Sequence, residues 1–320
     1  MKRLATTIVA ASFLTAIPSL GDWIYKGKWG DRGTGTGQFQ IPFGVACSSV
    51  GFVYVADSTN HRIQYFSDNG SFRGAWGTPG SGTGQFNEPV GVALAPDGDV
   101  YVTDRRNHRV QYFTASGSYL GRWGSEGSGT GNFNFPTGIA VGADGTVYVA
   151  DTNNNRIQYF STSGSYIGQW GQWGTGAGQF NNPAGVAVAP NTNVYVADTF
   201  NDRVQYFNGN GDYLGRWGTK GAGDKEFDRP ISTHVAPNGN VFVVDTGNHR
   251  VQYFNATGSF LGKWGRFGVG DGEFNGPNDI STLGSRAYVS DGKNDRIQYF
   301  EDTEYAVLPT SLGRVKALFE

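Results

Sequence analysis

Cysteine and charged residues are scarce in this sequence, and each shortage narrows the class of protein. One cysteine among 320 residues excludes a disulfide framework and a cysteine-based zinc site. Charged residues make up 16% and the formal net charge is −2, so no strong attraction to nucleic acid or to an anionic membrane is expected. The lone Cys47 lies in a strand pattern, where a small buried hydrophobic residue is the simplest interpretation.

Glycine and aromatic residues are abundant instead. The 50 glycines are about twice the number expected from an average content of about 7%, and aromatic residues make up 14%. Disordered chains are poor in aromatic residues, and collagen carries glycine at every third position, so both classes are excluded. The composition indicates a folded protein with many turns.

The first residues resemble a secretory signal peptide. Lys2 and Arg3 precede an apolar run from Leu4 to Ile17, and small residues follow up to Gly21. An uncleaved membrane anchor is the alternative, but this run is shorter than the ~20 residues that a bilayer requires. We therefore expect residues 1–21 to be removed, leaving a secreted, extracellular or periplasmic protein without a membrane span.

A unit of about 47 residues occurs six times. Val-Tyr-Val-Ala-Asp, or a close variant, ends each time at an aspartate, and an arginine follows five residues later. The aspartates are Asp57, Asp104, Asp151, Asp198, Asp245 and Asp291. In the second unit, short strands are predicted over residues 91–94, 100–104, 110–113 and 119–123. Four antiparallel strands at this period are typical of a β-propeller blade, so we predict one all-β domain, a six-bladed β-propeller over residues 22–300.

The order of the strands predicts how the ring closes. The segment from Trp23 to Gly30 matches a fourth strand, and the last unit ends after its third strand, Ile297 to Phe300. Pairing of these two segments would complete the last four-stranded antiparallel blade and leave no open sheet edge at the seam.

The repeated unit resembles the NHL repeat. Residues 86–113 read Phe-Asn-Glu-Pro-Val-Gly-Val-Ala-Leu-Ala-Pro-Asp-Gly-Asp-Val-Tyr-Val-Thr-Asp-Arg-Arg-Asn-His-Arg-Val-Gln-Tyr-Phe, including the Asn-His at 107 and 108. The resemblance covers roughly residues 22–300 and implies a six-bladed propeller. It implies less about activity, because NHL-like propellers include scaffolds, receptor ectodomains, RNA binders and some lyases and hydrolases.

Residues that recur in every unit are interpreted as scaffold, and those that vary as candidates for function. The repeated aspartate and arginine are expected to pair across a hairpin. The loops around one end of the channel mix aromatic, amide and charged side chains, which suits a protein or glycan ligand, or self-assembly. The candidate binding residues are Phe43, Arg105, Arg106, Phe135, Asn153, Phe200, Arg229, Asn278 and Lys293.

One pair of residues is a candidate for catalysis. His234 and Asp279 lie on neighbouring inner strands, where a carboxylate could orient an imidazole for general-base or metal chemistry. The alternative is a satisfied buried histidine with a channel-facing aspartate. The NHL-like peptidylglycine amidating lyase binds zinc through several channel histidines. Here the other histidines fall in hairpin loops, so a three-histidine site is unsupported and no metal or cofactor is predicted.

Two further features complete the interpretation. RNA binding would require a basic face, but the basic loop residues are scattered over separate units, so no nucleic-acid partner is predicted.

Residues 301–320 are expected to form a separate tail that packs on the propeller or docks to a partner or to another copy. The sequence thus predicts an exported, non-catalytic binding or assembly module, with a lyase or hydrolase centred on His234 and Asp279 as the competing hypothesis.

Overall fold

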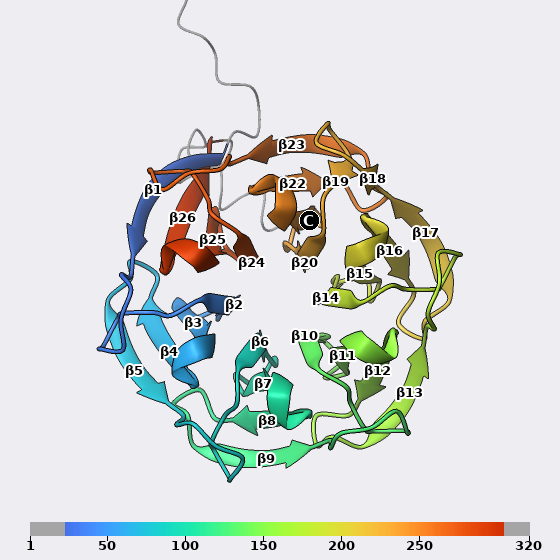
Figure 1. Cartoon of the computed structure of the whole chain (residues 1–320), viewed down its shortest axis with the longest axis horizontal. Helices are drawn as coiled ribbons and strands as arrows, with labels where there is room; N and C mark the ends of the chain where they lie inside the picture. The colour runs from blue at the N-terminus through green and yellow to red at the C-terminus, as the bar shows by residue number, and fades with distance from the viewer. Residues whose placement is uncertain (1–22, 304–320) are drawn as a thin grey trace, which may run out of the picture.

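The computed structural model describes residues 23–303, so the predicted signal peptide (1–21) and nearly all of the predicted tail (301–320) lie outside the described residues. The described residues form six four-stranded antiparallel sheets, which surround a central axis as the blades of a propeller (Figure 1). The predicted all-β, six-bladed propeller is confirmed. Within residues 23–303, no helix has the length and hydrophobicity needed to cross a membrane.

The strands occupy four concentric positions, from the axis outwards. The inner strands are β2 (Pro42–Cys47), β6 (Pro89–Leu94), β10 (Pro136–Val141), β14 (Pro183–Val188), β20 (Pro230–Val235) and β24 (Pro277–Leu283). The second strands are β3 (Phe52–Asp57), β7 (Val100–Asp104), β11 (Val147–Asp151), β15 (Val194–Asp198), β21 (Val241–Asp245) and β25 (Arg286–Asp291). The third strands are β4 (Arg62–Ser67), β8 (Arg109–Phe113), β12 (Arg156–Phe160), β16 (Arg203–Phe207), β22 (Arg250–Phe254) and β26 (Arg296–Asp302). The outer strands are β5 (Phe72–Trp76), β9 (Tyr119–Trp123), β13 (Tyr166–Trp170), β17 (Tyr213–Trp217), β23 (Phe260–Trp264) and β1 (Trp23–Trp29).

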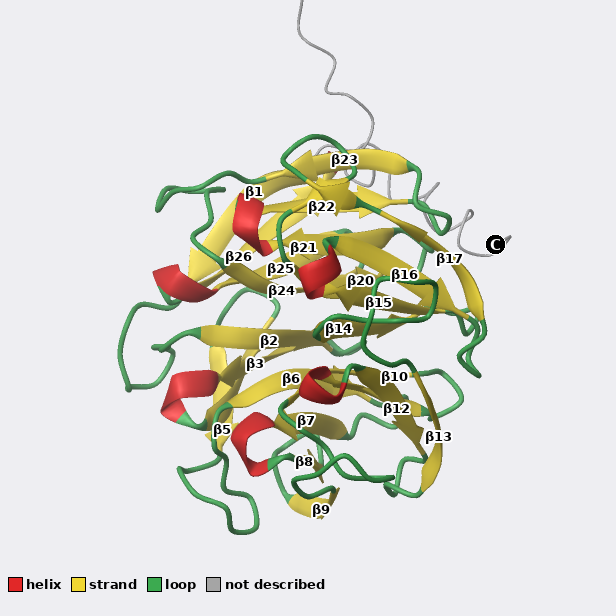
Figure 2. Cartoon of the chain, turned by 45° about the vertical axis from the view of Figure 1, so that its right-hand side comes forward, coloured by secondary structure: helices red, strands yellow, loops and turns green. Residues whose placement is uncertain are grey.

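Short 3-10 helices join the second and third strands, and all lie at the same end of the blades (Figure 2). They are η1 (Ser58–Asn60), η2 (Arg105–Asn107), η3 (Thr152–Asn154), η4 (Thr199–Asn201), η5 (Thr246–Asn248) and η6 (Gly292–Asn294). A small parallel pair, β18 (Thr219–Lys220) and β19 (Glu226–Phe227), lies in the connection that leads into blade 5. Blades 1 to 5 begin at β2, β6, β10, β14 and β20, and blade 6 begins at β24.

Blade 6 contains both ends of the described chain. Its sheet has the order β1-β26-β25-β24, and β1 pairs antiparallel with β26 (Figure 1). The register places Trp29 opposite Ile297 and Tyr25 opposite Phe300. The first described strand therefore fills the outer position that the last repeat leaves open, and no edge of β26 is exposed.

Apolar side chains between adjacent blades form the core. The second strands are rich in β-branched and aromatic residues, and both of their faces are buried because each sheet is sandwiched between two others. Each of six hydrophobic clusters joins residues of two neighbouring blades. Trp76 of blade 1, for example, packs 5.7 Å from the ring of Phe113 in blade 2, centroid to centroid.

A buried carboxylate organises the hairpin of every blade. Asp104 is fully buried and accepts hydrogen bonds from the side chains of Asn107 and Arg109 and from the backbone N–H of Asn87. The guanidinium of Arg109 also donates to three carbonyl oxygens of the connection between blades 1 and 2. The predicted aspartate–arginine pair forms in all six blades, with N–O distances of 2.7–2.8 Å.

A second repeated bond, the inter-blade clamp, joins each blade to the next. The residue before each repeated arginine has a left-handed backbone, and its side chain accepts a hydrogen bond from the backbone N–H of the residue before the next repeated proline. The acceptor and donor residues are His61 and Glu88, His108 and Phe135, Asn155 and Asn182, Asp202 and Arg229, His249 and Gly276, and Asp295 and Ile41. The clamps fix the entry of every inner strand.

Replacement of Asp104 by alanine should lower the free energy of unfolding by about 3–5 kcal/mol, because it leaves the guanidinium of Arg109 buried without its carboxylate. Urea denaturation measures this change. The exposed Asp97 of the same blade is the control, and Asp97→Ala should cost less than about 1 kcal/mol. Equal effects of the two substitutions would refute the assigned role of Asp104.

Candidate functional site

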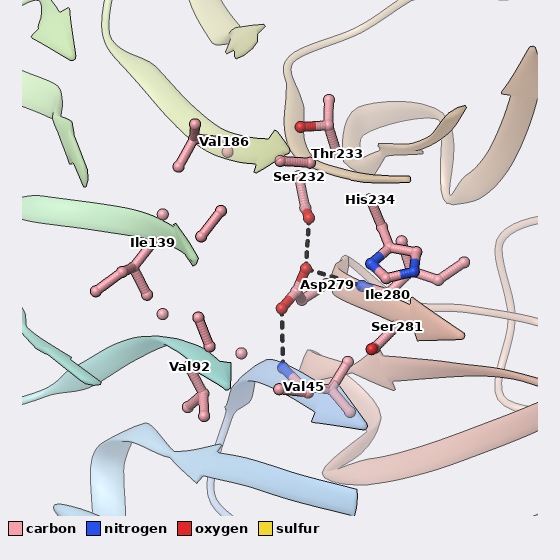
Figure 3. A pocket seen from close by; sticks show the side chains of 18 of the residues that line it. Val45, Val92, Ile139, Val186, Ser232, Thr233, His234, Asp279, Ile280 and Ser281 are labelled. Carbon is pink, nitrogen blue, oxygen red and sulfur yellow. Dashed lines mark hydrogen bonds between the residues drawn. The ribbon is translucent and has the colours of Figure 1, made fainter. Parts of the chain in front are cut away.

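The six inner strands enclose a cavity of about 210 Å³ on the axis of the ring (Figure 3). Aliphatic side chains such as Val92, Ile139 and Val186 line most of its wall. Apart from Thr137 on β10, the polar side chains of the lining gather in one sector, on β20 and β24. They are Ser232, Thr233, His234, Asn278, Asp279 and Ser281.

The polar sector is where blades 5 and 6 depart from the repeat. Gly44 belongs to a set of four inner-strand glycines that face the next blade, and a Cβ there would collide with the carbonyl oxygen of Val90. The same repeat position holds Ser232 in blade 5 and Asp279 in blade 6. Their side chains are therefore directed towards the inner strand of the next blade.

Asp279 joins three consecutive blades. Its carboxylate accepts hydrogen bonds from the hydroxyl of Ser232 in blade 5 and, over 2.8 Å, from the backbone N–H of Val45 in blade 1. It also accepts one from the N–H of Ile280 in its own strand, over 2.9 Å. These three donors engage both carboxylate oxygens, so the carboxylate makes its hydrogen bonds within the wall of the cavity.

His234 is also held by the next blade. The backbone N–H of Thr282 donates to Nε2 of His234 over 3.2 Å, and Oγ1 of Thr282 lies 2.8 Å from the same nitrogen. Since Nε2 accepts from an N–H group, the proton of the neutral ring resides on Nδ1. The lone pair that a general base would use is therefore already occupied.

The carboxylate-oriented imidazole that the sequence suggested does not form. Among the described residues no hydrogen bond joins His234 to Asp279, because Asp279 bonds to Ser232 and Val45 while His234 bonds to Thr282. In the 47-residue repeat Asp279 aligns with Ser232 and not with His234. Asp279 is thus directed to Val45 of blade 1, and His234 to Thr282 of blade 6.

Burial perturbs the titratable groups of the cavity. It raises the pKa of Asp279 to about 6, although the hydrogen bonds from Ser232, Val45 and Ile280 act in the opposite direction. It lowers the pKa of His234 to about 4. It also raises the pKa of Cys47 to about 12, so this thiol stays protonated and is not a nucleophile at neutral pH.

The nine candidate binding residues fall into two groups. Five are exposed at the end of the blades that carries the 3-10 helices and the connections between blades, which we name the loop face. These five are Arg106, Asn153, Phe200, Arg229 and Lys293.

The other four candidates are wholly or partly engaged inside the protein. Asn278 is buried and donates to the carbonyl oxygen of Pro42, so it is not available on the loop face. Phe43 lines the axial cavity. Arg105 and Phe135 are partly buried, and the guanidinium of Arg105 lies 5.3 Å from the ring centroid of Phe135.

Sequence comparison of the repeats missed the most exposed aromatic residues. Trp173 is 73% exposed and Phe267 is 66% exposed, and both lie on connections between blades. The same position of the connection carries Arg32, Pro79, Glu126, Trp173, Lys220 and Phe267. Aligning the connections as well as the hairpin loops would have found this variation.

No group of three or more histidine, cysteine, aspartate or glutamate side chains is placed to hold a metal ion within residues 23–303. His234 is the single histidine on an inner strand, and the other three take part in inter-blade clamps.

These features define the class of the protein as a six-bladed β-propeller with a small axial cavity and a variable loop face. Four segments, residues 86–113, 133–160, 180–207 and 227–254, match the family model described as NHL repeat. The chain therefore contains NHL repeats, as its sequence indicated. The matched segments lie in blades 2 to 5.

Two curated proteins are similar over a stretch of about one repeat. The B-box type zinc finger protein ncl-1 of Caenorhabditis elegans is 49% identical over 49 residues, which are 15% of this chain and 6% of that protein. The protein brain tumor of Drosophila melanogaster is 47% identical over 49 residues, or 15% of this chain and 5% of that protein. The similarity thus concerns the repeat and a small part of each relative.

Solved structures of several propellers are similar in fold. Virginiamycin B lyase from Staphylococcus aureus has a TM-score of 0.57 at 14% identity, covering 81% of this chain and 94% of that one. A gluconolactonase from Xanthomonas campestris has a TM-score of 0.63 at 13% identity, covering 89% and 99%. A chain of a nidogen/laminin complex has a TM-score of 0.54 at 18% identity, covering 70% and 80%. At these identities the similarity establishes the fold alone.

Nuclear magnetic resonance titration should show midpoints near pH 6 for the carboxyl group of Asp279 and near pH 4 for His234. The raised pKa of Asp279 makes its contribution to stability full below about pH 4, and this contribution is lost as the pH rises through about 6. The lowered pKa of His234 has the opposite effect, since its contribution is full above about pH 6.5 and is lost as the pH falls to about 4. A His234 midpoint at 6.5 or above would show that the ring is not held as described.

Proposed function

We propose that this propeller is a non-catalytic binding module that holds a protein partner on its loop face. The observation that carries the proposal is the exposure of two aromatic side chains, Trp173 at 73% on the connection that leads into blade 4 and Phe200 at 55% on η4 of blade 4. Asn201, next to Phe200, donates to the carbonyl oxygen of Gly174, next to Trp173, over 2.9 Å. The backbone segments that carry the two rings are thus bonded to each other on the loop face.

The fold does not require an aromatic residue at either position. The backbone of Trp173 forms a parallel bridge with the buried Phe180, and arginine, proline and glutamate occupy the equivalent bridged position in other blades. Phe200 corresponds to Asn153 in blade 3 and to Arg106 in blade 2. Tryptophan is enriched among the residues that dominate interface energies, so an exposed tryptophan on a loop of variable sequence is a candidate anchor for a partner.

The surroundings favour a protein over a small ligand. Phe267, Val269 and Ile41 are further exposed apolar residues on other connections, so the apolar groups are spread around the loop face. The same face also carries exposed cations, among them Arg229 and Lys293. A mixed surface of this extent suits a protein partner, whereas a sugar would be held by a local group of side chains.

The competing enzyme hypothesis has less support. His234 has its basic nitrogen bonded to Thr282, and Asp279 has both oxygens engaged by neighbouring blades. The lyase and gluconolactonase activities belong to proteins that resemble this chain in fold only. We also propose export of the protein, on the basis of the N-terminal sequence, so the partner would be extracellular or periplasmic.

The double substitution Trp173→Glu with Phe200→Asn should weaken binding of a captured partner about 30-fold, because aromatic anchors of this kind contribute about 2 kcal/mol or more. Both new residues already occur at the equivalent positions of blade 3, so the melting temperature should change by less than about 2 °C. The partner would be isolated with the unmodified protein from the native extracellular fluid, identified by mass spectrometry and titrated by calorimetry.

The matched control changes Val50 and Ile167 to alanine, since these apolar residues are 77% and 54% exposed and lie away from the loop face, on the turn after β2 and on β13. This control should leave the affinity within about twofold. Undiminished affinity of the double variant would refute the proposal that Trp173 and Phe200 anchor the partner. A glycan array on which the unmodified protein binds and the double variant does not would identify a carbohydrate ligand instead of a protein.

A screen of lactone, ester and lyase substrates tests the competing hypothesis. We expect no turnover that His234→Ala abolishes, since Nε2 of His234 is not free to accept a proton. Turnover that requires both His234 and Asp279 would establish an enzyme and overturn the non-catalytic assignment.

A further inference from the structure

All four histidines of the chain serve as hydrogen-bond acceptors between blades. Nδ1 of His61, His108 and His249 accepts the clamp bond from Glu88, Phe135 and Gly276, over 3.1, 3.2 and 3.0 Å. Nε2 of His234 accepts the N–H of Thr282. These bonds lie at three of the six seams, between blades 1 and 2, 2 and 3, and 5 and 6.

Each of these bonds requires a neutral imidazole. A protonated ring carries N–H groups on both nitrogens, so the accepting nitrogen becomes a donor and faces another donor. The backbone N–H of the next blade then loses its partner, which costs about 1–3 kcal/mol where that group is buried. Acidification therefore acts on the seams directly.

The three clamp histidines also hold strained backbone. His61, His108 and His249 have φ values of 55°, 52° and 56°, and their donor partners Glu88 and Phe135 have φ values of 61° and 52°. Non-glycine residues in this left-handed region cost roughly 1–2 kcal/mol each. Loss of the clamp bond would allow both chain segments to relax at the loop face.

The charged and aromatic neighbours differ from one histidine to the next. His61 faces the segment of Glu88, whose carboxylate pairs with Arg105 and Arg106. The ring of His108 packs 4.7 Å from that of Phe135, over which Arg105 also lies.

His249 and His234, both of blade 5, bond to opposite ends of the inner strand of blade 6, at Gly276 and Thr282. His249 packs 5.0 Å from the ring of Phe267, with Lys293, Asp291, Asp228 and Arg229 nearby. His234 packs against Phe242 and lines the cavity that also contains Asp279.

We propose that the histidine clamps make the propeller an acid-responsive device, in which protonation loosens the loop face at the three histidine seams while the seam held by Asn155 stays closed. Asn155 forms the same clamp to Asn182 over 2.9 Å with an amide that does not titrate. The Asn155–Asn182 clamp is thus an internal control that does not respond to pH. The inference holds whether or not the loop face binds a protein.

The direction of the pH effect follows from the acceptor role. Burial is the main cause that lowers the pKa of His249, and burial alone lowers that of His234. For such groups stability is complete above the ordinary histidine value of about 6.5 and is lost as the pH falls through the depressed folded value. Asp279, with its raised pKa, acts in the opposite sense and remains unchanged in the variant described below.

Residue-resolved amide hydrogen exchange of the unmodified protein tests the proposal without any substitution. Between pH 7.5 and pH 5, after correction for intrinsic exchange rates, protection at the amides of Glu88, Phe135 and Gly276 should fall about tenfold, as expected for loss of roughly one hydrogen bond. Protection at Asn182 should change less than about twofold over the same range. Equal changes at all four amides would overturn the proposal.

A variant separates the histidine clamps from other acid effects. His61→Asn, His108→Asn and His249→Asn together reproduce the Asn155 clamp at three seams. This triple variant should keep its protection at pH 5 within about twofold of its value at pH 7.5. The same tenfold loss in the triple variant would assign the pH response to other groups and refute the role of the clamps.

Discussion

A buried carboxylate at the end of each second strand is the interaction on which the ring depends. Asp57 and its five equivalents are fully buried, and each accepts hydrogen bonds from asparagine, arginine and glutamine side chains and from a backbone N–H of the preceding connection. A buried charge is tolerated only when it is paired and hydrogen-bonded. The connection cannot move without uncovering that charge, because the paired arginine also holds carbonyl oxygens of the connection. The connections between blades are therefore held in place by the buried ion pairs, and they fix the positions of the loop-face side chains that they carry.

Sixfold repetition distinguishes two kinds of departure from the repeat. On the inner strands, Ser232, His234 and Asp279 replace small residues, but each is used in a bond to the next blade. On the loop face, Trp173 and Phe200 occupy positions where the residue type varies from blade to blade, and both side chains remain largely exposed. The inner-strand substitutions are explained by the hydrogen bonds that they make to the next blade. Within residues 23–303, these two aromatic side chains of the loop face make no such bond and have no role in the scaffold. Exposed departures are therefore the better indicator of function in this molecule.

The sequence was sufficient for the architecture and insufficient for the candidate site. The strands of the second repeat, the β1–β26 pair and the aspartate–arginine pairs follow from periodicity and from residue types alone. The partners of His234 and Asp279 do not follow from the sequence. Alignment of the repeats places the two residues on neighbouring strands, but it does not fix the atom of the next blade that each side chain bonds, and the two do not bond each other. Asn278 illustrates the same difficulty. Its place beside a repeated proline predicts a binding residue on the loop face, whereas its side chain is buried and donates to the carbonyl oxygen of Pro42.

The seam between blades 6 and 1 explains why polar residues accumulate on β24. A single strand, β1, carries the chain from blade 6 into blade 1, and β24 to β26 attach to blade 1 through non-covalent contacts only. Apolar contacts are non-directional and do not fix the register of one strand against another. Hydrogen bonds do, and Asp279 to Val45, Asn278 to Pro42 and Arg286 to Asp68 all cross this seam. The polar residues Asn278 and Asp279 of β24 are thus explained by the closure of the ring at this seam, because both of their side chains are engaged in hydrogen bonds to blade 1.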